Sequence, residues 1–430
     1  MKRVVLNFAE FLLSKSTLVV VVLGLFLHLA LIGKHLDNSV ISSYMPTAQD
    51  AQDYADRARS WQSDGFTQSF SDAYRLPGYP FLILVMQFLM PSNPYLGVRL
   101  LQLLAVAISA GMIKVTIERF VPRWAAILAA LVYVVLPIWH FVPVLLAESF
   151  TSFIVVALIF KLRSVGEIGL GRWAVITLSI LIAAGVYLKP NNLLLLFLVC
   201  VFLFAKLKMN SIRNISTISL AVVILLSPWL FFASNAQPGF HGLTTNSGAN
   251  LYVGTGMIIA YDEGILSKSA IKWKVDPRNN PKDLIELDSE ISPAMQNSDL
   301  TKKSLEIWQK RPLQEIGYGF DKALIAFGIK SSSMFDHIFG LFSILALLSG
   351  IALLRIKKFN AWGIVLLFTF FSLALQAAIF QADRRFVIPV LFPFATVCLG
   401  LTIGLFPMSS FKSTLLRFSS RLKHQFEPRS

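Results

Sequence analysis

Long apolar runs separated by short polar segments dominate this chain from end to end. A helix needs about 20 predominantly apolar residues to cross the hydrocarbon core of a bilayer, and most of these runs approach that length. The pattern predicts an all-α polytopic membrane protein with about ten transmembrane helices. The predicted spans are residues 16–33, 96–113, 124–145, 149–162, 173–188, 192–206, 214–233, 337–354, 361–380 and 386–407.

The composition supports this interpretation. Of the 430 residues, 55% are hydrophobic and only 15% are charged, whereas soluble domains have about 25% charged residues. Residues 1–430 are therefore predicted to form a single membrane domain. Lys2 and Arg3 precede the first apolar run and no small-residue cleavage signature follows it, so we expect that run to stay as an anchor.

The connecting segments divide into a basic set and a nearly neutral set. The basic set contains twenty Lys and Arg but only four acidic residues, which accounts for the net charge of +15. Because cytoplasmic segments carry the excess of Lys and Arg, both termini are predicted to be cytoplasmic, including a basic tail at 408–430. We expect a bacterial inner membrane protein in contact with membrane lipids, and the charge requires no nucleic acid partner.

Two long loops, residues 34–95 and 234–336, fall on the opposite, extracytoplasmic side, and function is expected there. In the first loop, Asp50 lies in the first turn of a predicted amphipathic helix on the membrane surface. The apolar run 81–90 is too short to span, so it predicts an interfacial helix. In the second loop, the glycines between 248 and 256 predict tight turns.

Several short motifs follow one another along the chain. They are Asp50-x-x-x-Tyr54-x-x-x-Ala58, Arg75-Leu-Pro-Gly-Tyr-Pro80, Leu146-Ala-Glu148, Lys189-Pro190, Ser227-Pro-Trp229, Asn246-Ser-Gly248-Ala-Asn250-Leu-Tyr-Val-Gly254 and Arg385-Phe-Val-Ile-Pro389. In this order they resemble the GT-C membrane glycosyltransferases, such as the protein O-mannosyltransferases and the aminoarabinose transferases of lipid A. No single motif is specific, and the resemblance depends on their order along most of the chain.

The resemblance implies an inverting transfer of a sugar from a polyprenyl-phosphate donor to an extracytoplasmic glycan, lipid or protein. Such a reaction needs a base for the acceptor hydroxyl and cations for the departing phosphate. Asp50 is the predicted base, with Asp53 as a competing candidate. Many members of the family have an acidic residue where Ala51 follows Asp50, which leaves a second carboxylate at that position in doubt.

The other candidates lie near predicted span ends. Glu148 is expected to have a buried partner: it could orient the acceptor, hold a divalent ion with Asp50, or form a structural salt bridge with an arginine. No metal site is assigned. Cations can meet a lipid-linked phosphate at this depth. The predicted phosphate ligands are Arg75, Arg385, Lys189 and Arg384, and the predicted substrate-binding residues are Tyr54, Tyr79, Asn246 and Asn250.

Two alternatives remain open at this point. A transporter or flippase of lipid-linked sugars would need related halves or broken helices near the bilayer midplane, and the sequence has no internal repeat. A polysaccharide polymerase or ligase would join preassembled glycans carried on a polyprenyl diphosphate. The motifs of the first loop favour transfer of a single sugar. The identity of the sugar and of the acceptor depends on cavity shape, which the motifs do not encode.

Overall fold

A computed structural model describes residues 15–42, 49–135, 137–165, 170–237, 240, 242–262, 293–310, 312–329, 334–380 and 384–405. The predicted basic tail, 408–430, and a large part of the second loop lie outside these residues. The described chain is helical, in agreement with the predicted all-α class.

The α-helices follow one another with short connections. In chain order they are α2 (Lys15–Ile32), α3 (Gln49–Asp64), α4 (Phe66–Ser69), α5 (Gly78–Leu89), α6 (Pro94–Glu118), α7 (Arg123–Val135), α8 (Glu148–Leu162), α9 (Arg172–Leu188), α10 (Leu194–Leu207), α11 (Ile212–Ala236), α12 (Ser247–Asp262), α14 (Pro293–Lys310), α15 (Pro312–Ala326), α16 (Met334–Leu354), α17 (Asn360–Ile379) and α18 (Arg384–Leu405). Short 3₁₀ helices lie at Gly33–His35 (η1), Pro137–Phe141 (η2), Pro190–Leu193 (η3) and Lys208–Ser211 (η4).

Each of the ten predicted spans overlaps a helix. Within the described residues, six helical stretches are long and apolar enough to cross a membrane. They are Lys15–His35, Pro94–Glu118, Pro190–Ala236, His337–Leu354, Asn360–Ile379 and Arg385–Leu405. The chain is therefore a multi-pass membrane protein, while the total of ten crossings and their orientation stay predictions.

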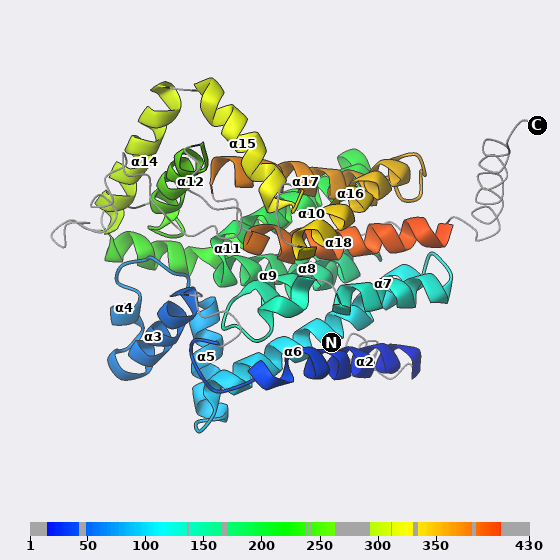
Figure 1. Ribbon diagram of the computed structural model, residues 1–430, viewed down its shortest axis with the longest axis horizontal. Helices are drawn as coiled ribbons and strands as arrows, with labels where there is room; N and C mark the ends of the chain where they lie inside the picture. The colour runs from blue at the N-terminus through cyan, green and yellow to red at the C-terminus, as the bar shows by residue number, and fades with distance from the viewer. Residues whose placement is uncertain are drawn as a thin grey trace, which may run out of the picture.

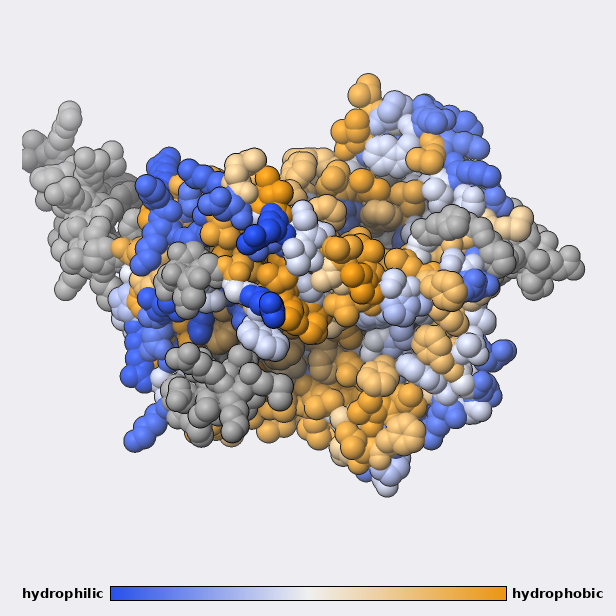
Figure 2. Space-filling view, turned by 180° about the vertical axis from the view of Figure 1, so that it is seen from behind, coloured by the Kyte–Doolittle hydropathy of each residue, from blue (hydrophilic) through white to orange (hydrophobic). Residues whose placement is uncertain are grey.

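The arrangement in space agrees with this conclusion. In Figure 1 the helices α2, α6, α16 and α18 run along the long axis, and α3, α4 and α14 gather at the end opposite the end of α18. Figure 2 shows hydrophilic residues near both ends of this axis and a broad hydrophobic band between them. Such a band is the surface that lipid tails would cover.

The predicted span 124–145 is wrong in its second half. The helix α7 ends at Val135 and a 3₁₀ helix begins at Pro137. Proline has no backbone N–H and its ring clashes with the preceding turn, so the α-helix does not continue through this position. The connection to α8 is therefore a compact buried segment, with Val142, Val144 and Leu145 inaccessible to solvent.

The structure of both long loops differs from the structure predicted from the sequence. The apolar stripe of α3, including Ala51, Ala55 and Ala58, is fully buried, and α3 packs against α5, so the stripe covers protein and does not lie on the membrane surface.

In the second loop the expected turns are part of α12. There Gly248 and Gly254 permit close contact, because a Cβ at either position would overlap a backbone carbonyl, of Asn297 or of Phe380.

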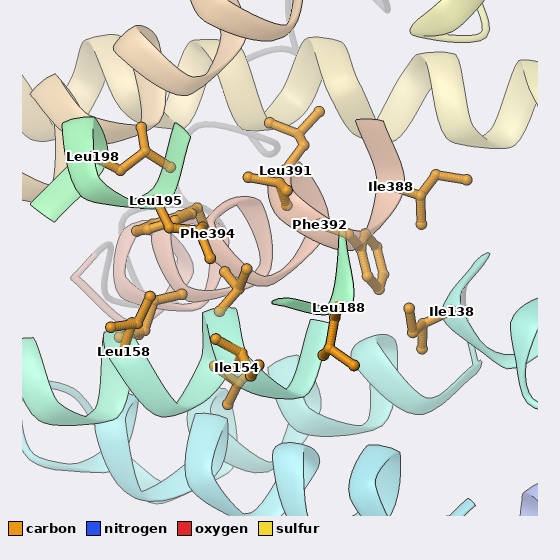
Figure 3. Close-up of a cluster of buried hydrophobic side chains, with 14 of the residues drawn as sticks. Ile138, Ile154, Leu158, Leu188, Leu195, Leu198, Ile388, Leu391, Phe392 and Phe394 are labelled. Carbon is orange, nitrogen blue, oxygen red and sulfur yellow. The ribbon is translucent and has the colours of Figure 1, made fainter. Parts of the chain in front are cut away.

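The core lies where α8, α10 and α18 meet. Ile154, Leu158, Leu195, Leu198 and Leu391 interlock there with the end of α9 (Figure 3). Close packing of this kind resists small displacements. It holds the ends of α8, α9 and α18 in register, and those ends carry the charged residues described next.

Candidate active site

Asp50 lies between two arginines that come from distant parts of the chain. Its Oδ1 accepts a hydrogen bond from Nη2 of Arg75 at 2.5 Å, and its Oδ2 accepts one from Nη1 of Arg385 at 3.0 Å. Asp50 is the second residue of α3 and Arg385 the second residue of α18. A helix N-terminus carries a partial positive charge, which stabilises Asp50 but repels Arg385. The Asp50 carboxylate therefore offsets an unfavourable position of Arg385.

The chain of ion pairs continues from Arg75 into the first loop. Arg75 Nε donates to Asp53 Oδ2 at 2.6 Å, and Arg57 Nε donates to Asp53 Oδ1 at 3.0 Å. Arg57 then binds both carboxylate oxygens of Asp72, at 2.9 and 2.8 Å. Asp53 thus has an arginine on each oxygen. This pairing makes Asp53 a support for Arg75, although its competing candidacy as the base stays a prediction.

Glu148 and Lys189 form a second ion pair beside the first. Lys189 Nζ donates to Glu148 Oε1 at 2.8 Å, and the Glu148 side chain is only 3% exposed. The expected buried partner is therefore a lysine. Glu148 opens α8 and Lys189 follows the last residue of α9, positions at which the helix dipole favours a carboxylate and an ammonium respectively. Lys189 also lies over the ring of Phe386, 4.2 Å from its centroid.

The eight charged side chains named so far form one balanced group. Four are acidic and four are basic: Asp50, Asp53, Asp72, Glu148, Arg57, Arg75, Lys189 and Arg385. An anionic ligand would add negative charge to this group, and it would compete with a carboxylate for its cations.

These charges shift the protonation equilibria in the group. Burial opposes ionisation of Asp50, but the charges of Arg75, Arg385 and Lys189 outweigh it and lower the pKa of its carboxyl. Burial also opposes the charge of Arg75, yet the neighbouring Tyr54, Asp50 and Asp53 raise the pKa of its guanidinium. Asp50 is therefore ionised at neutral pH, and both of its oxygens are occupied by hydrogen bonds.

Gly78 brings the Arg75 segment against the end of α9. A Cβ at Gly78 would lie 2.5 Å from the carbonyl oxygen of Tyr187, two residues before Lys189. Only glycine permits this approach. The motif Arg75-Leu-Pro-Gly-Tyr-Pro80 thus has a structural reason for its glycine, because the contact links the segment with Arg75 to the one with Lys189.

The second loop holds the same segment from the other side. Thr245 donates from its backbone N–H to the carbonyl of Ala73 at 3.0 Å and from its hydroxyl to the carbonyl of Asp72 at 2.9 Å. The side chain of Gln237 donates to the carbonyl of Ser71 at 2.8 Å. These bonds fix the backbone on which Asp72 and Arg75 are carried.

The two predicted substrate-binding tyrosines lie beneath the ion pairs. Their rings are 4.8 Å apart, and the guanidinium of Arg75 lies over the Tyr54 ring at 5.4 Å. Tyr79 is fully buried and donates its hydroxyl to Oε1 of Gln102 at 2.7 Å. The structure gives both rings a packing role under Arg75, and their contact with substrate stays a prediction.

The remaining predicted residues are placed as follows. Asn246 is buried, and its side-chain oxygen accepts a hydrogen bond from the Thr244 hydroxyl at 2.8 Å. Asn250 is half-buried in α12. Arg384 is the first residue of α18, but its side chain lies outside the described residues.

A small cavity of about 10 Å³, the size of a single water site, lies beside the ion pairs between α8, α10, α17 and α18. Lys189 and Arg385 line it together with the polar side chains of Thr151, Asn191 and Gln376. Asn192 adds a further polar side chain, and the rest of the lining is apolar, from Leu194, Leu373, Phe386, Pro389 and Val390. An anion larger than a water molecule can reach these two cations only if the lining side chains move apart. Within the described residues no group of three or more His, Cys, Asp or Glu side chains could hold a metal ion.

Four residues of this region were not among the candidates predicted from the sequence. Arg57 and Asp72 complete the row of ion pairs, while Arg99 and Gln102 are buried on α6 and bind the carbonyls of the segment before Glu148. Gln102 donates to the carbonyls of Val142 and Val144 at 2.8 and 2.9 Å. An arginine inside an apolar run was the available signal for Arg99, since a buried charge requires partners.

Comparison with known proteins identifies the fold of this chain. No protein-family model and no curated protein sequence matches the chain. Among solved structures it is similar to the oligosaccharyltransferase of Archaeoglobus fulgidus. In the apo form the TM-score is 0.51 at 13% identity, covering 97% of this chain and 53% of that one. In the form tethered with an acceptor peptide the TM-score is also 0.51, at 11% identity, covering 92% and 50%.

A structure of ArnT from Cupriavidus metallidurans bound to undecaprenyl phosphate has a TM-score of 0.37 at 13% identity, covering 82% of this chain and 72% of that one. This score is too low to support an argument. The likeness to the archaeal enzyme shows that the chain has a GT-C-like fold. The chain spans about half the length of that enzyme.

Proposed function

We propose that this multi-pass chain with a GT-C-like fold is a glycosyltransferase that takes a sugar from a polyprenyl-phosphate donor and transfers it, with inversion, to an extracytoplasmic acceptor. The observation that carries the proposal is Asp50 held between Arg75 and Arg385, with Lys189 close enough to lower its pKa. One carboxylate among several cations, beside a pocket with an apolar wall, offers both a base and a phosphate site.

In the proposed reaction the acceptor hydroxyl attacks the anomeric carbon of the donor sugar. The bond from that carbon to the phosphate oxygen breaks, polyprenyl phosphate leaves with the electron pair, and Asp50 takes the hydroxyl proton. Arg385, Lys189 and Arg75 stabilise the charge that develops on the leaving phosphate. A base supplied in this way accounts for about 10²- to 10⁴-fold of a rate enhancement.

Asp50 is a weak base while each of its oxygens is bound to an arginine, because these cations lower its pKa. A donor phosphate fits the cations on the pocket side, Arg385 and Lys189, and it lies at the N-terminus of α18, which favours an anion. Once Arg385 turns to the phosphate, Asp50 loses one of the charges that lower its pKa. Donor binding would therefore release an oxygen of Asp50 and raise its basicity in the same step.

Glu148 has a different role from Asp50 in the proposed reaction. Because Lys189 neutralises it at 2.8 Å, Glu148 holds this lysine at the edge of the pocket. Its predicted role in orienting the acceptor depends on Lys189 moving to the phosphate. A divalent ion between Glu148 and Asp50 would have to replace their present cationic partners, so the proposal assigns no metal.

The test compares Asp50→Asn with Asp53→Asn in proteoliposomes supplied with a labelled polyprenyl-phosphate sugar and a crude acceptor fraction. We expect Asp50→Asn to lose at least about 10²-fold of the transfer rate. Asp53→Asn, which keeps an amide oxygen for Arg57 or Arg75, should lose far less. Thermal unfolding of both variants controls for stability. Full transfer by Asp50→Asn would remove the proposed base, and loss confined to Asp53→Asn would assign the role to Asp53.

A second candidate is the transfer of a preassembled glycan from a polyprenyl diphosphate. The likeness to an oligosaccharyltransferase favours it, and a site with several cations suits a diphosphate as well as a monophosphate. The same assay is repeated with a labelled oligosaccharide carried on polyprenyl diphosphate. Only the true donor should give a product whose formation depends on Asp50, so the assay separates the two candidates.

A further inference from the structure

Helix α15 has three faces of different character. One face is buried and consists of Glu315, Gly319, Lys322 and Ala326. A second face exposes large apolar side chains at helical spacing, with Leu313 85%, Ile316 60% and Phe320 67% exposed. A third face is polar and contains Gln314 and Tyr318, which are hydrogen-bonded to each other at 2.7 Å.

The buried face fixes α15 to the end of a membrane-spanning helix. A Cβ at Gly319 would lie 3.1 Å from that of Ala378 in α17. Lys322 Nζ donates to the carbonyl of Phe380, just past the end of α17, at 3.0 Å and to that of Gly254 at 3.3 Å. Since α17 has the length and hydropathy of a span, α15 lies at the depth where α17 meets the membrane boundary.

The span against which α15 packs, α17, and its neighbour α16 also expose large apolar side chains. On α17, Phe371 is 67% and Leu375 49% exposed, and on α16 Leu341 is 59% exposed. In Figure 1, α14 and α15 form an elbow that projects to the side of the bundle, across the direction of the long helices. From behind, this projection has hydrophobic and hydrophilic residues side by side (Figure 2).

We propose that α15 is a membrane-interface helix whose face of Leu313, Ile316 and Phe320 is covered by the acyl chains of membrane lipids. An apolar face beside a polar one is the pattern of helices that lie in the interfacial plane. The direction of the elbow favours lipid over an aqueous partner, because a projection across the spans stays within the plane of the membrane. This inference does not depend on the proposed glycosyl transfer.

Lys322 connects this lipid contact to the candidate active site. It binds the carbonyl of Phe380, which lies five residues before Arg385 in the chain. It also binds α12 through Gly254, so α12, α15 and the end of α17 meet at one ammonium group. The lipid contact of α15 therefore helps to hold Phe380, the last described residue before α18.

Site-directed spin labelling tests this placement. The only two cysteines, Cys200 and Cys398, are replaced by alanine, and a nitroxide is attached to Ile316→Cys in liposomes of phosphatidylethanolamine and phosphatidylglycerol. Collision rates are measured with oxygen, which concentrates in hydrocarbon, and with a water-soluble nickel chelate. Phe371→Cys on α17 is the lipid-facing control, and Lys302→Cys on α14, whose native side chain is 72% exposed, is the aqueous control.

The expected ratio of oxygen to nickel collisions at 316 is close to that at 371 and several-fold above that at 302. A ratio at 316 equal to that at 302 would overturn the proposal by placing the face in water. Low rates with both reagents would also overturn it, because they would show the face covered by protein, such as a second copy of the chain. Phe320→Cys repeats the measurement should the first variant fail to insert.

Discussion

Arg385 donates a hydrogen bond to Asp50 across a separation of 335 positions in the chain, at 3.0 Å. The contact joins the first loop to α18, the last helix of the described chain, and it places a carboxylate at a helix N-terminus that carries an arginine. Asp50 offsets the repulsion between Arg385 and the N-terminus of α18, and it keeps Arg75 as a second partner. We therefore expect the pair to control both the access of an anion to Arg385 and the basicity of Asp50.

Replacing Arg385 by Gln should raise the pKa of Asp50, because one of the charges that oppose its protonation is removed. In the wild type the pKa is lowered, so the ion pair persists above about pH 4, the ordinary value for Asp, and is lost only as the pH falls further. A hydrophobic carbodiimide, which modifies protonated carboxyl groups, reports this change by mass spectrometry.

We expect the variant to be modified at Asp50 at a higher pH than the wild type, with Asp50→Asn as the unreactive blank. Identical pH profiles for the wild type and Arg385→Gln would show that Arg385 does not control this carboxylate in the membrane.

Replacing Lys189 by Met should destabilise the protein more than replacing both partners of its ion pair. The single change leaves Glu148, only 3% exposed, without its cation, and an uncompensated buried charge costs about 3–5 kcal/mol. Adding Glu148→Gln removes that charge and should recover much of the loss. Thermal unfolding in detergent measures the cycle, and equal losses in the single and double variants would mean that Glu148 is neutral or solvated.

Gly78→Ala should destabilise the junction between the first loop and α9. Its Cβ would lie 2.5 Å from the Tyr187 carbonyl oxygen, and overpacking of this kind typically costs about 1–3 kcal/mol. The matched control is Gly171→Ala, where a Cβ has no atom within 4 Å. The melting temperature should fall for Gly78→Ala only. Equal effects of the two changes would contradict the close approach.

The proposed sidedness predicts that Ser63, exposed at the end of α3, faces the periplasm, whereas Asn210 in the exposed connection from α10 to α11 faces the cytoplasm. In a chain without Cys200 and Cys398, a membrane-impermeant maleimide added to intact spheroplasts should label Ser63→Cys and spare Asn210→Cys. The reverse pattern would place the ion pairs in the cytosol, where an enzyme of the proposed kind could not reach an extracytoplasmic acceptor.

The sequence determined the features that are local along the chain. Hydropathy located a helix at each predicted span, since an apolar run of sufficient length can satisfy its backbone in lipid only as a helix. The motifs that resemble those of the GT-C enzymes, together with their positions near predicted span ends, selected Asp50, Arg75, Lys189, Arg385 and Glu148 as candidates. Periodicity identified the apolar stripe of α3 but not the surface that covers it.

Tertiary structure alone decided which charges meet. The sequence contains no sign that Arg57 binds Asp72, that Lys189 and not an arginine neutralises Glu148, or that Asp50 is shared by two arginines. An ion pair depends on the distance between atoms in space, and the partners here come from helices up to 335 positions apart. Hydropathy and periodicity report only on neighbours along the chain, so the packing of α3, α8, α9 and α18 had to be known before the site could be assembled.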